Sequence, residues 1–143
     1  MIHPTTLIKI RFEEDEKIIQ VSDLQLNKKR LDIFSPDGWV EISEFIDMKM
    51  VKAYTIYTDN GFSLQTDYKQ SFKSNFGWIP ANEIVILNLK GPIHINTVKK
   101  MSKAIASPNE SNIPVVGIVV NHPNHRFWAA GVEVLDDSDT GSR

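Results

Sequence analysis

Alternation of apolar and polar side chains predicts strands along most of this chain. In the segment 7–12, three apolar side chains alternate with Lys9 and Arg11, which is the period-two pattern of a half-buried strand. The charged segment 13–17 interrupts this pattern before it resumes at 18–21. These two runs therefore predict a hairpin with a solvated turn.

Turn-forming residues mark the next strands. The cluster Ser-Pro-Asp-Gly at 35–38 favours a turn, and a new strand is expected from Trp39. Asn60 and Gly61 stand between two alternating runs that are rich in β-branched and aromatic residues, so the segment 53–66 predicts a hairpin.

The remaining apolar runs predict three strands and one helix. Residues 85–89 are apolar and follow a short turn, which indicates a buried strand. A helix is predicted from Thr97 to Ile105 because apolar residues recur there at spacings of three and four, and the polar segment 107–112 after it is the best linker candidate. The run 115–120 is expected to pair with 125–128 across a turn.

A last short strand is expected at 132–135, followed by a polar end that favours a flexible tail. The pattern as a whole predicts an all-β single domain with one short helix and no internal repeat.

Composition narrows the class of protein. With 143 residues, of which 41% are hydrophobic, the chain can bury a core of its own without disulfides or a structural metal. The net charge of -2 argues against a nucleic-acid binder that relies on a basic field. The absence of cysteine excludes thiolate metal sites, disulfides and a cysteine nucleophile. The chain shows neither a transmembrane run nor a signal peptide, so we expect a soluble, cytoplasmic protein that does not bind a membrane.

Motifs for common chemistries are missing. His122 and His125 have a spacing of three, but a proline lies between them and no further ligand is near in sequence, so a metal site is not favoured. The acidic run 13–16 lacks the alternating oxygen ligands and the glycine of a calcium loop. Phosphate-binding glycine loops, nucleophile elbows and paired carboxylates are also absent from the sequence.

Four segments, taken in order, match the conserved blocks of one family. Residues 1–8 resemble an opening block in which a Cys or Ser nucleophile precedes a Thr-x-Ile strand, matched by Thr6 and Ile8. Residues 61–69 resemble a hairpin that ends in Thr-x-x-His, where Thr66 matches and Lys69 replaces the histidine.

The other two segments extend the match over nearly the whole chain. Residues 77–84 are similar to a Gly-Trp, Ala and Glu-Leu stretch, and 124–134 resemble the late block His-x-Phe-Tyr-Ala-Asn-Gly-x-x-Val. Together these segments resemble the Hint domain of inteins, elements that splice themselves out of a host protein. The resemblance implies a horseshoe-like Hint fold, with a splicing domain at 1–137 and a short flank at 138–143. The interval 72–114 is too short to hold a homing endonuclease, so a minimal intein is expected.

The resemblance places Met1 at the position of the upstream nucleophile. A thioether has no proton to lose, so Met1 cannot start the reaction. Either Met1 replaces a native Ser or Cys, with Ser favoured because the chain avoids cysteine, or this copy is inactive; we favour the first. Thr66 and Lys69 would polarise the upstream peptide bond. A lysine ammonium is a weak acid at neutral pH, so Lys69 as a merely solvated side chain is an equal alternative.

At the downstream end, the resemblance implies that His125 acts as a proton relay for cleavage. Asp136 or Asp137 stands where the family has a terminal asparagine, and Asp137 is favoured because Ser138 then becomes the downstream nucleophile. A carboxylate must cyclise through oxygen, so this step should be slow. The family's penultimate histidine is also missing.

The function implied by the resemblance is therefore self-splicing, in cis or after two split halves associate, without a metal or organic cofactor. Its partners would be the flanking segments of a host protein and, if the chain is split near Gln25 or within 107–112, its own complementary fragment. Two alternatives remain: a Hint relative that cleaves without ligation, and a non-catalytic β-rich interaction module. In that module, aromatic side chains would serve as core or contact residues: Trp39, Tyr54, Tyr57, Trp78 and Trp128.

Overall fold

Strands dominate the computed structural model, which describes residues 1–25 and 29–138. In chain order the elements of these residues are β1 (Leu7–Phe12), β2 (Asp15–Gln20), a 3-10 turn (Val21–Asp23), β3 (Asp32–Ser35), β4 (Gly38–Thr58), β5 (Ser63–Asp67), β6 (Ser71–Ser74), β7 (Gly77–Pro80), α1 (Ala81–Asn88), β8 (Ile93–Asn96), β9 (Met101–Val120), β10 (Arg126–Ala129) and β11 (Val132–Leu135). Within the described ranges, no helix has the length and apolar character needed to cross a membrane.

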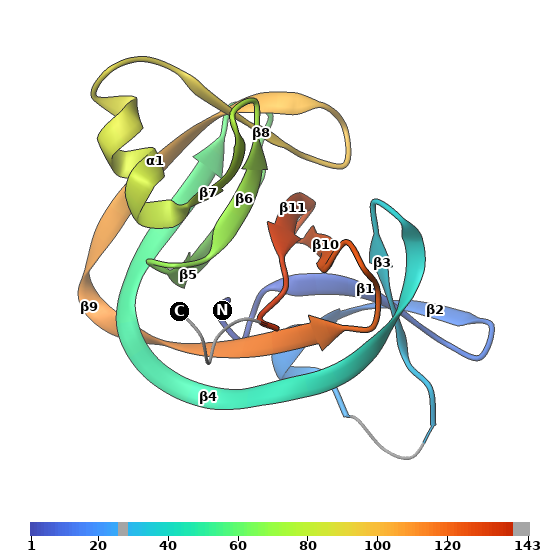
Figure 1. Cartoon of the computed structure of the whole chain (residues 1–143). Coiled ribbons are helices and arrows are strands. Elements are labelled where there is room, and N and C mark those ends of the chain that lie inside the picture. Colours follow the sequence, from blue (N-terminus) through green and yellow to red (C-terminus); the bar gives the residue numbers. More distant parts are fainter. Residues whose placement is uncertain (26–28, 139–143) are drawn as a thin grey trace.

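Two long strands, β4 and β9, form the frame of the molecule. They pair antiparallel along most of their length and curve together around the other strands (Figure 1). Their register shifts at three places, between Ile42 and Glu44, between Ile46 and Lys49, and between Lys52 and Tyr54. Each shift inserts extra residues on one strand, which bends the ribbon and increases its twist. The bent ribbon gives the horseshoe-like outline that the sequence predicts.

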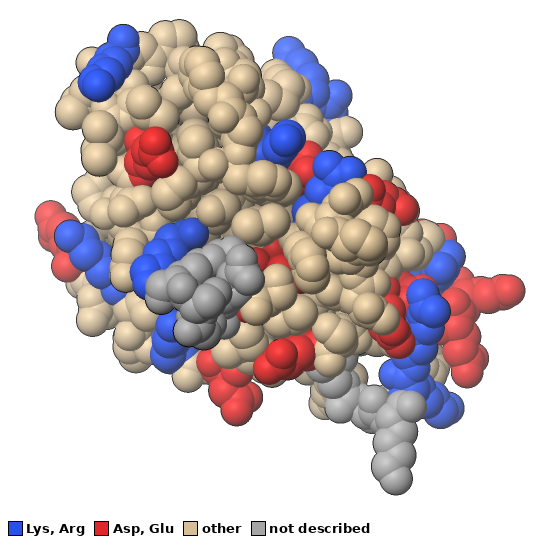
Figure 2. Space-filling view, in the orientation of Figure 1, with Lys and Arg blue, Asp and Glu red and all other residues tan. Residues whose placement is uncertain are grey.

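Short strands complete the sheet at both ends of this ribbon. The strand order is β10-β11-β6-β8-β9-β4-β3-β1-β2, with β5 on β4 and β7 on β6, and every pair is antiparallel. The predicted hairpins at 7–21 and 53–66 are confirmed as β1–β2 and β4–β5, and the turn at 35–38 joins β3 to β4. Acidic and basic side chains are interspersed over the lower half of the face in Figure 2, whereas its upper half is mostly uncharged.

The predicted helix at 97–105 is wrong. Residues from Met101 onward belong to β9, where small side chains such as Ser102 and Ala104 point inward and Met101 and Ile105 point to solvent. The apolar residues that suggested a helical stripe are thus exposed: Val98 is 48% exposed in the bend before β9, and Ile105 is 51% exposed on the outer face of β9. Pairing with β8 and β4 overrides the helical spacing.

Among the described residues the α-helix lies instead at 81–88, and it covers most of the segment 85–89 for which the sequence predicts a buried strand. Pro80 precedes it in an extended conformation, and Ala81 and Ile84 turn one face inward at helical spacing. The Asn88 side chain fastens the helix to β9, since its Nδ2 donates to the Ala104 carbonyl at 3.0 Å and its Oδ1 accepts from the Ala106 N–H at 3.1 Å. A continuous apolar run cannot distinguish these two structures by periodicity.

Two more expectations are corrected. The segment 107–112 is not a linker but the middle of β9, where Pro108 pairs with Tyr54 and Asn112 with Lys52. The run 115–120 pairs with β4 rather than with the strand at 126–129, which pairs with β11. Local composition cannot indicate these pairings, because the partner strand β4 lies more than 50 residues earlier in the chain.

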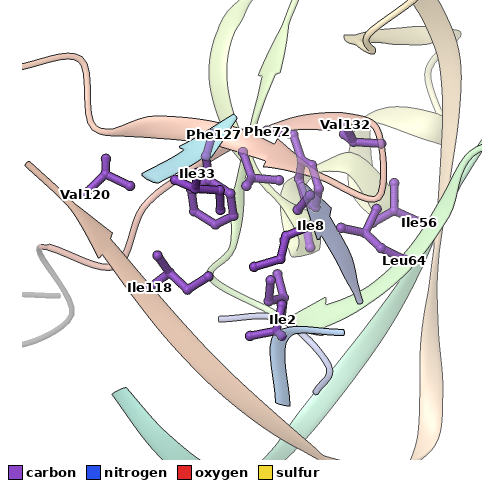
Figure 3. Close-up of a cluster of buried hydrophobic side chains, with 14 of the residues drawn as sticks. Ile2, Ile8, Ile33, Ile56, Leu64, Phe72, Ile118, Val120, Phe127 and Val132 are labelled. Atoms are coloured by element: carbon purple, nitrogen blue, oxygen red, sulfur yellow. The ribbon is translucent and has the colours of Figure 1, made fainter. Parts of the chain in front are cut away.

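The first residues of the chain run through the interior. Ile2 is 1% exposed and forms isolated bridges with Thr66 of β5 and Val116 of β9. Figure 3 shows it within a cluster of buried apolar side chains. The labelled side chains are Ile2, Ile8, Ile33, Ile56, Leu64, Phe72, Ile118, Val120, Phe127 and Val132. This packing fixes the position of residue 1 relative to both long strands.

Candidate functional site

Backbone hydrogen bonds hold residue 1 between β5 and β9. The Ile2 N–H donates to the Val116 carbonyl at 2.9 Å, and the Val116 N–H donates back to Ile2 at 2.8 Å. The Asp67 N–H donates to the Met1 carbonyl at 3.1 Å. Met1 itself is 2% exposed. Residue 1 is therefore buried and held in a fixed register.

Three side-chain oxygens surround the α-amino nitrogen of Met1. Gln70 Oε1 lies at 2.7 Å, Asp137 Oδ1 at 3.0 Å and Asp67 Oδ1 at 3.3 Å. All three side chains are buried, so the contacts are poorly screened by water. In a chain that continues upstream of residue 1, the same nitrogen would be a peptide nitrogen, and these oxygens would surround the peptide bond that precedes residue 1.

Asp137 is fixed by β9. Its N–H donates to the Ile118 carbonyl at 3.0 Å, and its Oδ2 accepts the Ile118 N–H at 3.0 Å. Burial raises the pKa of Asp137, and the Met1 amine and the Ile118 N–H oppose this shift. Gly117 leaves the necessary space, because a Cβ there would lie 3.0 Å from Asp137 Oδ2 and from Ile46 Cβ.

A second cluster adjoins the first through the next residue along the chain. Asp136 is fully buried, and its Oδ2 accepts the Val120 N–H at 2.9 Å and faces His125 Nδ1 at 3.1 Å. Its Oδ1 accepts the Ser138 hydroxyl at 2.7 Å and the Ser138 N–H at 3.1 Å. The Asp136 carboxylate thus links the His125 imidazole to the Ser138 hydroxyl.

The structure brings most of the sequence-predicted residues to one place. Met1 and Asp137 are in contact, and His125, Asp136 and Ser138 form the neighbouring cluster. These residues come from the start of the chain and from the segment that holds β10 and β11, and Figure 1 shows both within the curve of β4 and β9. The flank at 138–143 begins with Ser138, and its residues 139–143 lie outside the described part.

Thr66 and Lys69 occupy different environments. Thr66 is fully buried beside Ile2, and its hydroxyl donates to the Asp67 carbonyl at 2.9 Å. Lys69 is half-buried, and its Nζ lies 5.4 Å from the centre of the Tyr68 ring rather than at the Met1 nitrogen.

Sequence reasoning missed Asp67 and Gln70, the two residues that meet the Met1 nitrogen from the β5–β6 region. Gln70 follows directly after the position at which the family pattern has its histidine, so its place in the sequence was the available signal. The residue that contacts the nitrogen of residue 1 is therefore Gln70, the neighbour of Lys69.

The histidines at 122 and 125 face different carboxylates. His122 Nδ1 lies 3.6 Å from Asp37 and accepts the Asn124 N–H at 3.1 Å, whereas His125 faces Asp136. Over residues 1–25 and 29–138, the side chains form no group of three or more that could hold a metal ion.

Comparisons with known proteins give the fold. No family model and no curated protein matches the chain. Among solved structures, the VidaL intein in a selenomethionine variant is similar, with 18% identity, coverage of 94% of this chain and 95% of that one, and a TM-score of 0.77. A DnaB intein from Synechocystis sp. PCC 6803 has 19% identity, coverage of 94% and 96%, and a TM-score of 0.74. The gp41-1 intein has 15% identity, coverage of 94% and 97%, and a TM-score of 0.73.

These structures share one architecture with this chain over nearly its whole length. The chain has the Hint fold of the inteins, an all-β horseshoe with a single short helix among the residues described. The resemblance read from the four sequence segments is therefore confirmed at the level of the fold.

Proposed function

We propose that this chain is a protein-splicing domain that spans 1–137 and acts on the segments flanking it. One observation carries the proposal: the nitrogen of residue 1 lies 3.0 Å from Oδ1 of Asp137, at the opposite end of the proposed domain. Splicing has to exchange bonds between two distant points of a chain. Holding both points in one buried site turns this exchange into an intramolecular reaction.

The upstream step requires a nucleophile that Met1 does not supply. A Ser or Cys at position 1 would attack the preceding carbonyl through its side-chain oxygen or sulfur. This attack forms an ester or thioester, breaks the peptide bond and leaves the nitrogen of residue 1 as an amine. Asp67 and Gln70 surround that nitrogen and would stabilise its developing positive charge. Met1 therefore leaves this copy unable to begin, and the smaller Ser or Cys would fit the same enclosed position.

The downstream step has its groups in the second cluster. The Ser138 hydroxyl oxygen would attack the ester or thioester, take the upstream acyl group and release the side chain of residue 1 as a hydroxyl or thiol. Asp136 accepts the hydrogen bond of the Ser138 hydroxyl at 2.7 Å. Asp137 would then attack its own carbonyl through a carboxyl oxygen, which forms a cyclic anhydride, breaks the peptide bond to Ser138 and passes the carboxyl proton to the Ser138 nitrogen. The upstream acyl group would shift from the Ser138 oxygen to this free amine, which joins the flanking segments by a peptide bond. An asparagine at 137 would form a succinimide through nitrogen instead. We therefore expect Asp137 to slow this step, with His125 assisting proton transfer through Asp136.

The test places the full chain between two reporter domains with Met1→Ser and Asp137→Asn combined, and follows intact mass. We expect a joined reporter pair and a free domain of 137 residues. A parallel Met1→Cys variant allows for the other native nucleophile, and Asp136→Asn in place of Asp137→Asn tests the alternative junction. The unmodified chain between the same reporters is the control and should not ligate.

The other outcomes separate the alternatives. Detached reporters without ligation would show a cleavage-only Hint domain. Unreacted precursor in every variant, from a folded sample, would contradict the proposal and favour an interaction module. The partners proposed here are the flanking segments. A complementary fragment is a partner only if the chain is split. Coexpression of the pieces 1–25 and 26–143, with Met1→Ser and Asp137→Asn, between the reporters tests whether two such fragments associate and splice.

A further inference from the structure

The Gln70 side chain lies between the two ends of the proposed domain. It is 2% exposed, and its Oε1 accepts from the nitrogen of Met1 at 2.7 Å. Its Nε2 donates to the Leu135 carbonyl at 2.8 Å and, less closely, to Ser71 at 3.3 Å. One amide group therefore contacts residue 1 and the end of β11, which are 69 and 65 residues away from it in the chain.

The hydrogen-bond partners fix the orientation of this amide. Met1 presents a donor and Leu135 presents an acceptor, so the carbonyl oxygen of Gln70 must face Met1 and its NH₂ must face Leu135. The reverse orientation would set N–H against N–H and oxygen against oxygen. Because the amide is rigid and planar, a shift of either contact displaces the other.

The backbone of Gln70 is also anchored. Its carbonyl accepts the N–H of Ala81, the first residue of α1, at 2.9 Å. On the other side, Leu135 pairs with Arg126 in the β10–β11 hairpin, next to His125. Gln70 is thus held by the helix and in turn holds the strand that leads into Asp136 and Asp137.

We propose that Gln70 is the positioning residue that couples the upstream and downstream junctions, so that the two cleavages lead to ligation. This inference rests on the proposed splicing function and adds a determinant of its outcome. Transfer to Ser138 needs residue 1 and the end of β11 at a fixed separation, and the Gln70 amide spans that separation. Without it, Asp67 would still contact the nitrogen of residue 1 and Asp136 would still accept the Ser138 hydroxyl, so each junction could be cleaved, but independently of the other.

The experiment uses the Met1→Ser, Asp137→Asn chain between two reporters as the parent. Gln70→Met keeps a side chain of similar length and removes both hydrogen bonds. We expect it to lower the ratio of ligated to singly cleaved product by about tenfold or more, since misplacement by an ångström can cost about a hundredfold in rate. Gln70→Glu keeps the acceptor towards residue 1 and sets a carboxylate against the Leu135 carbonyl, so it should also lose ligation while upstream cleavage continues.

Gln65→Met is the matched control, because it makes the same chemical change on the half-exposed face of β5. It should leave the product ratio within about twofold of the parent, as expected for a half-exposed side chain whose change leaves the contacts of residue 1 and Leu135 with Gln70 in place. Thermal unfolding of each variant excludes loss of the fold as the cause. A parent-like product ratio in a folded Gln70→Met chain would overturn the proposal while leaving the splicing function intact.

A second measurement does not depend on splicing. In the unmodified chain, NMR shifts of the Met1 nitrogen and of the Leu135 carbonyl carbon report the two ends of the bridge. Gln70→Met should move both shifts, and Gln65→Met should move neither. If a parent chain fails to splice but both shifts move, the bridge stands and the proposed function falls. If either shift stays in place, the coupling proposal is wrong.

Discussion

Asp37 and Arg126, which are 89 residues apart in the chain, form a two-point ion pair, with Nη2 at 2.7 Å from Oδ1 and Nε at 2.9 Å from Oδ2. The third guanidinium nitrogen, Nη1, donates to Glu133 Oε2 at 3.1 Å, and Glu133 is 2% exposed. Arg126 thus ties the β3–β4 turn to β11. Arg126 directly follows His125, so its ion pairs also fix the position of His125, the proposed proton relay.

Arg126→Met should destabilise the fold strongly. The change would leave Glu133 buried without its cation, and breaking a buried pair in this way costs roughly 3–5 kcal/mol. Arg126→Lys should lower the free energy of unfolding by less, because it keeps the positive charge, although a lysine cannot make the two-point contact with Asp37. The measurement is the free energy of unfolding from urea titration. The double variant Arg126→Met, Glu133→Gln also removes the buried, unpaired carboxylate, so it should recover part of the lost unfolding free energy. A cost below about 1 kcal/mol for Arg126→Met alone would contradict this prediction, because it would mean that water screens the ion pairs.

The same pair predicts how stability depends on acid. The hydrogen bond from Arg126 lowers the pKa of Asp37 to about 2, with a further contribution from Asn124 and from the nearby His122. The unfolded chain binds a proton at Asp37 near the ordinary value of about 3.9, so the stabilisation is complete above that pH and lost as pH falls towards 2. Unfolding measured against pH should therefore show Asp37→Asn less stable than the parent at pH 7, with the difference vanishing by about pH 2. A constant difference over that range would contradict the assignment.

Asp137 should show the opposite dependence. Burial raises its pKa, so the folded chain holds a proton at a pH where the unfolded chain has released it, and the contribution to stability falls as pH rises through the folded value. We expect Asp137→Asn to be more stable than the parent at pH 7, because the amide keeps the acceptor for Ile118 without a buried charge. The advantage should disappear below about pH 4, near the ordinary carboxyl pKa.

Chemical denaturation from pH 3 to 8 measures this difference, with intact mass confirming that the tail stays attached to the Asp137→Asn chain. Asp23→Asn changes an exposed carboxylate and serves as the control. If the parent is as stable as Asp137→Asn at pH 7, or more stable, then the attraction between the Met1 amine and the Asp137 carboxylate exceeds the cost of burying that carboxylate, and the prediction is wrong.

Local patterns predicted the parts of this fold whose partners are close in sequence. Asn60 and Gly61 specify their hairpin because the turn and both strands lie within one short segment. The helix prediction at 97–105 failed because Met101 and Ile105 are apolar but exposed, so their spacing did not report a buried face. An apolar side chain on the surface is common, and no property of the residue itself distinguishes it from a core residue.

The residues of the candidate site could not be grouped from local sequence patterns. Met1 and Asp137 were assigned to one site through the resemblance to the Hint domain, since no periodicity relates residues so far apart. Gln70 was missed because its role depends on where Leu135 lies, which only the folded chain fixes. The sequence could indicate residue types suited to the chemistry, but not which of two adjacent residues, Lys69 or Gln70, faces the nitrogen of residue 1.

This distinction predicts that Lys69 is dispensable. Its Nζ lies over the Tyr68 ring at 5.4 Å, while Gln70 contacts Met1. In the Met1→Ser, Asp137→Asn chain between reporters, Lys69→Met should change the ligation rate by less than about twofold, as is usual for a side chain outside the reacting groups. Time-resolved gel quantification measures the rate, and Gln70→Met gives the contrasting result. A tenfold or larger loss of ligation rate in Lys69→Met would contradict this prediction and support Lys69 as a proton donor.

Gly131 lies in the turn at the closed end of the β10–β11 hairpin, whose open end leads to His125 and Asp136. Its φ is +80°, and a Cβ there would overlap Cε1 of the Phe62 ring. Gly131→Ala therefore combines an unfavourable backbone conformation with overlap in a packed region, and we expect a loss of roughly 2–4 kcal/mol in unfolding free energy. Gly61→Ala is a matched control, because φ is +97° there and an added Cβ meets nothing within 4 Å. Its loss should be limited to the backbone cost of about 1–2 kcal/mol.

Removing the obstructing ring separates the two causes. Phe62→Ala combined with Gly131→Ala should cost less than the sum of the two single changes, since the added methyl group then occupies the space of the ring. Double-mutant analysis of urea unfolding measures this coupling. Because the 130–131 turn joins β10 to β11, a shift there would also move His125 relative to Asp136, which the shift of the His125 ring protons would report. Equal losses for Gly131→Ala and Gly61→Ala, with no coupling to Phe62, would show that the turn relaxes without cost and that its conformation does not hold the cluster in place.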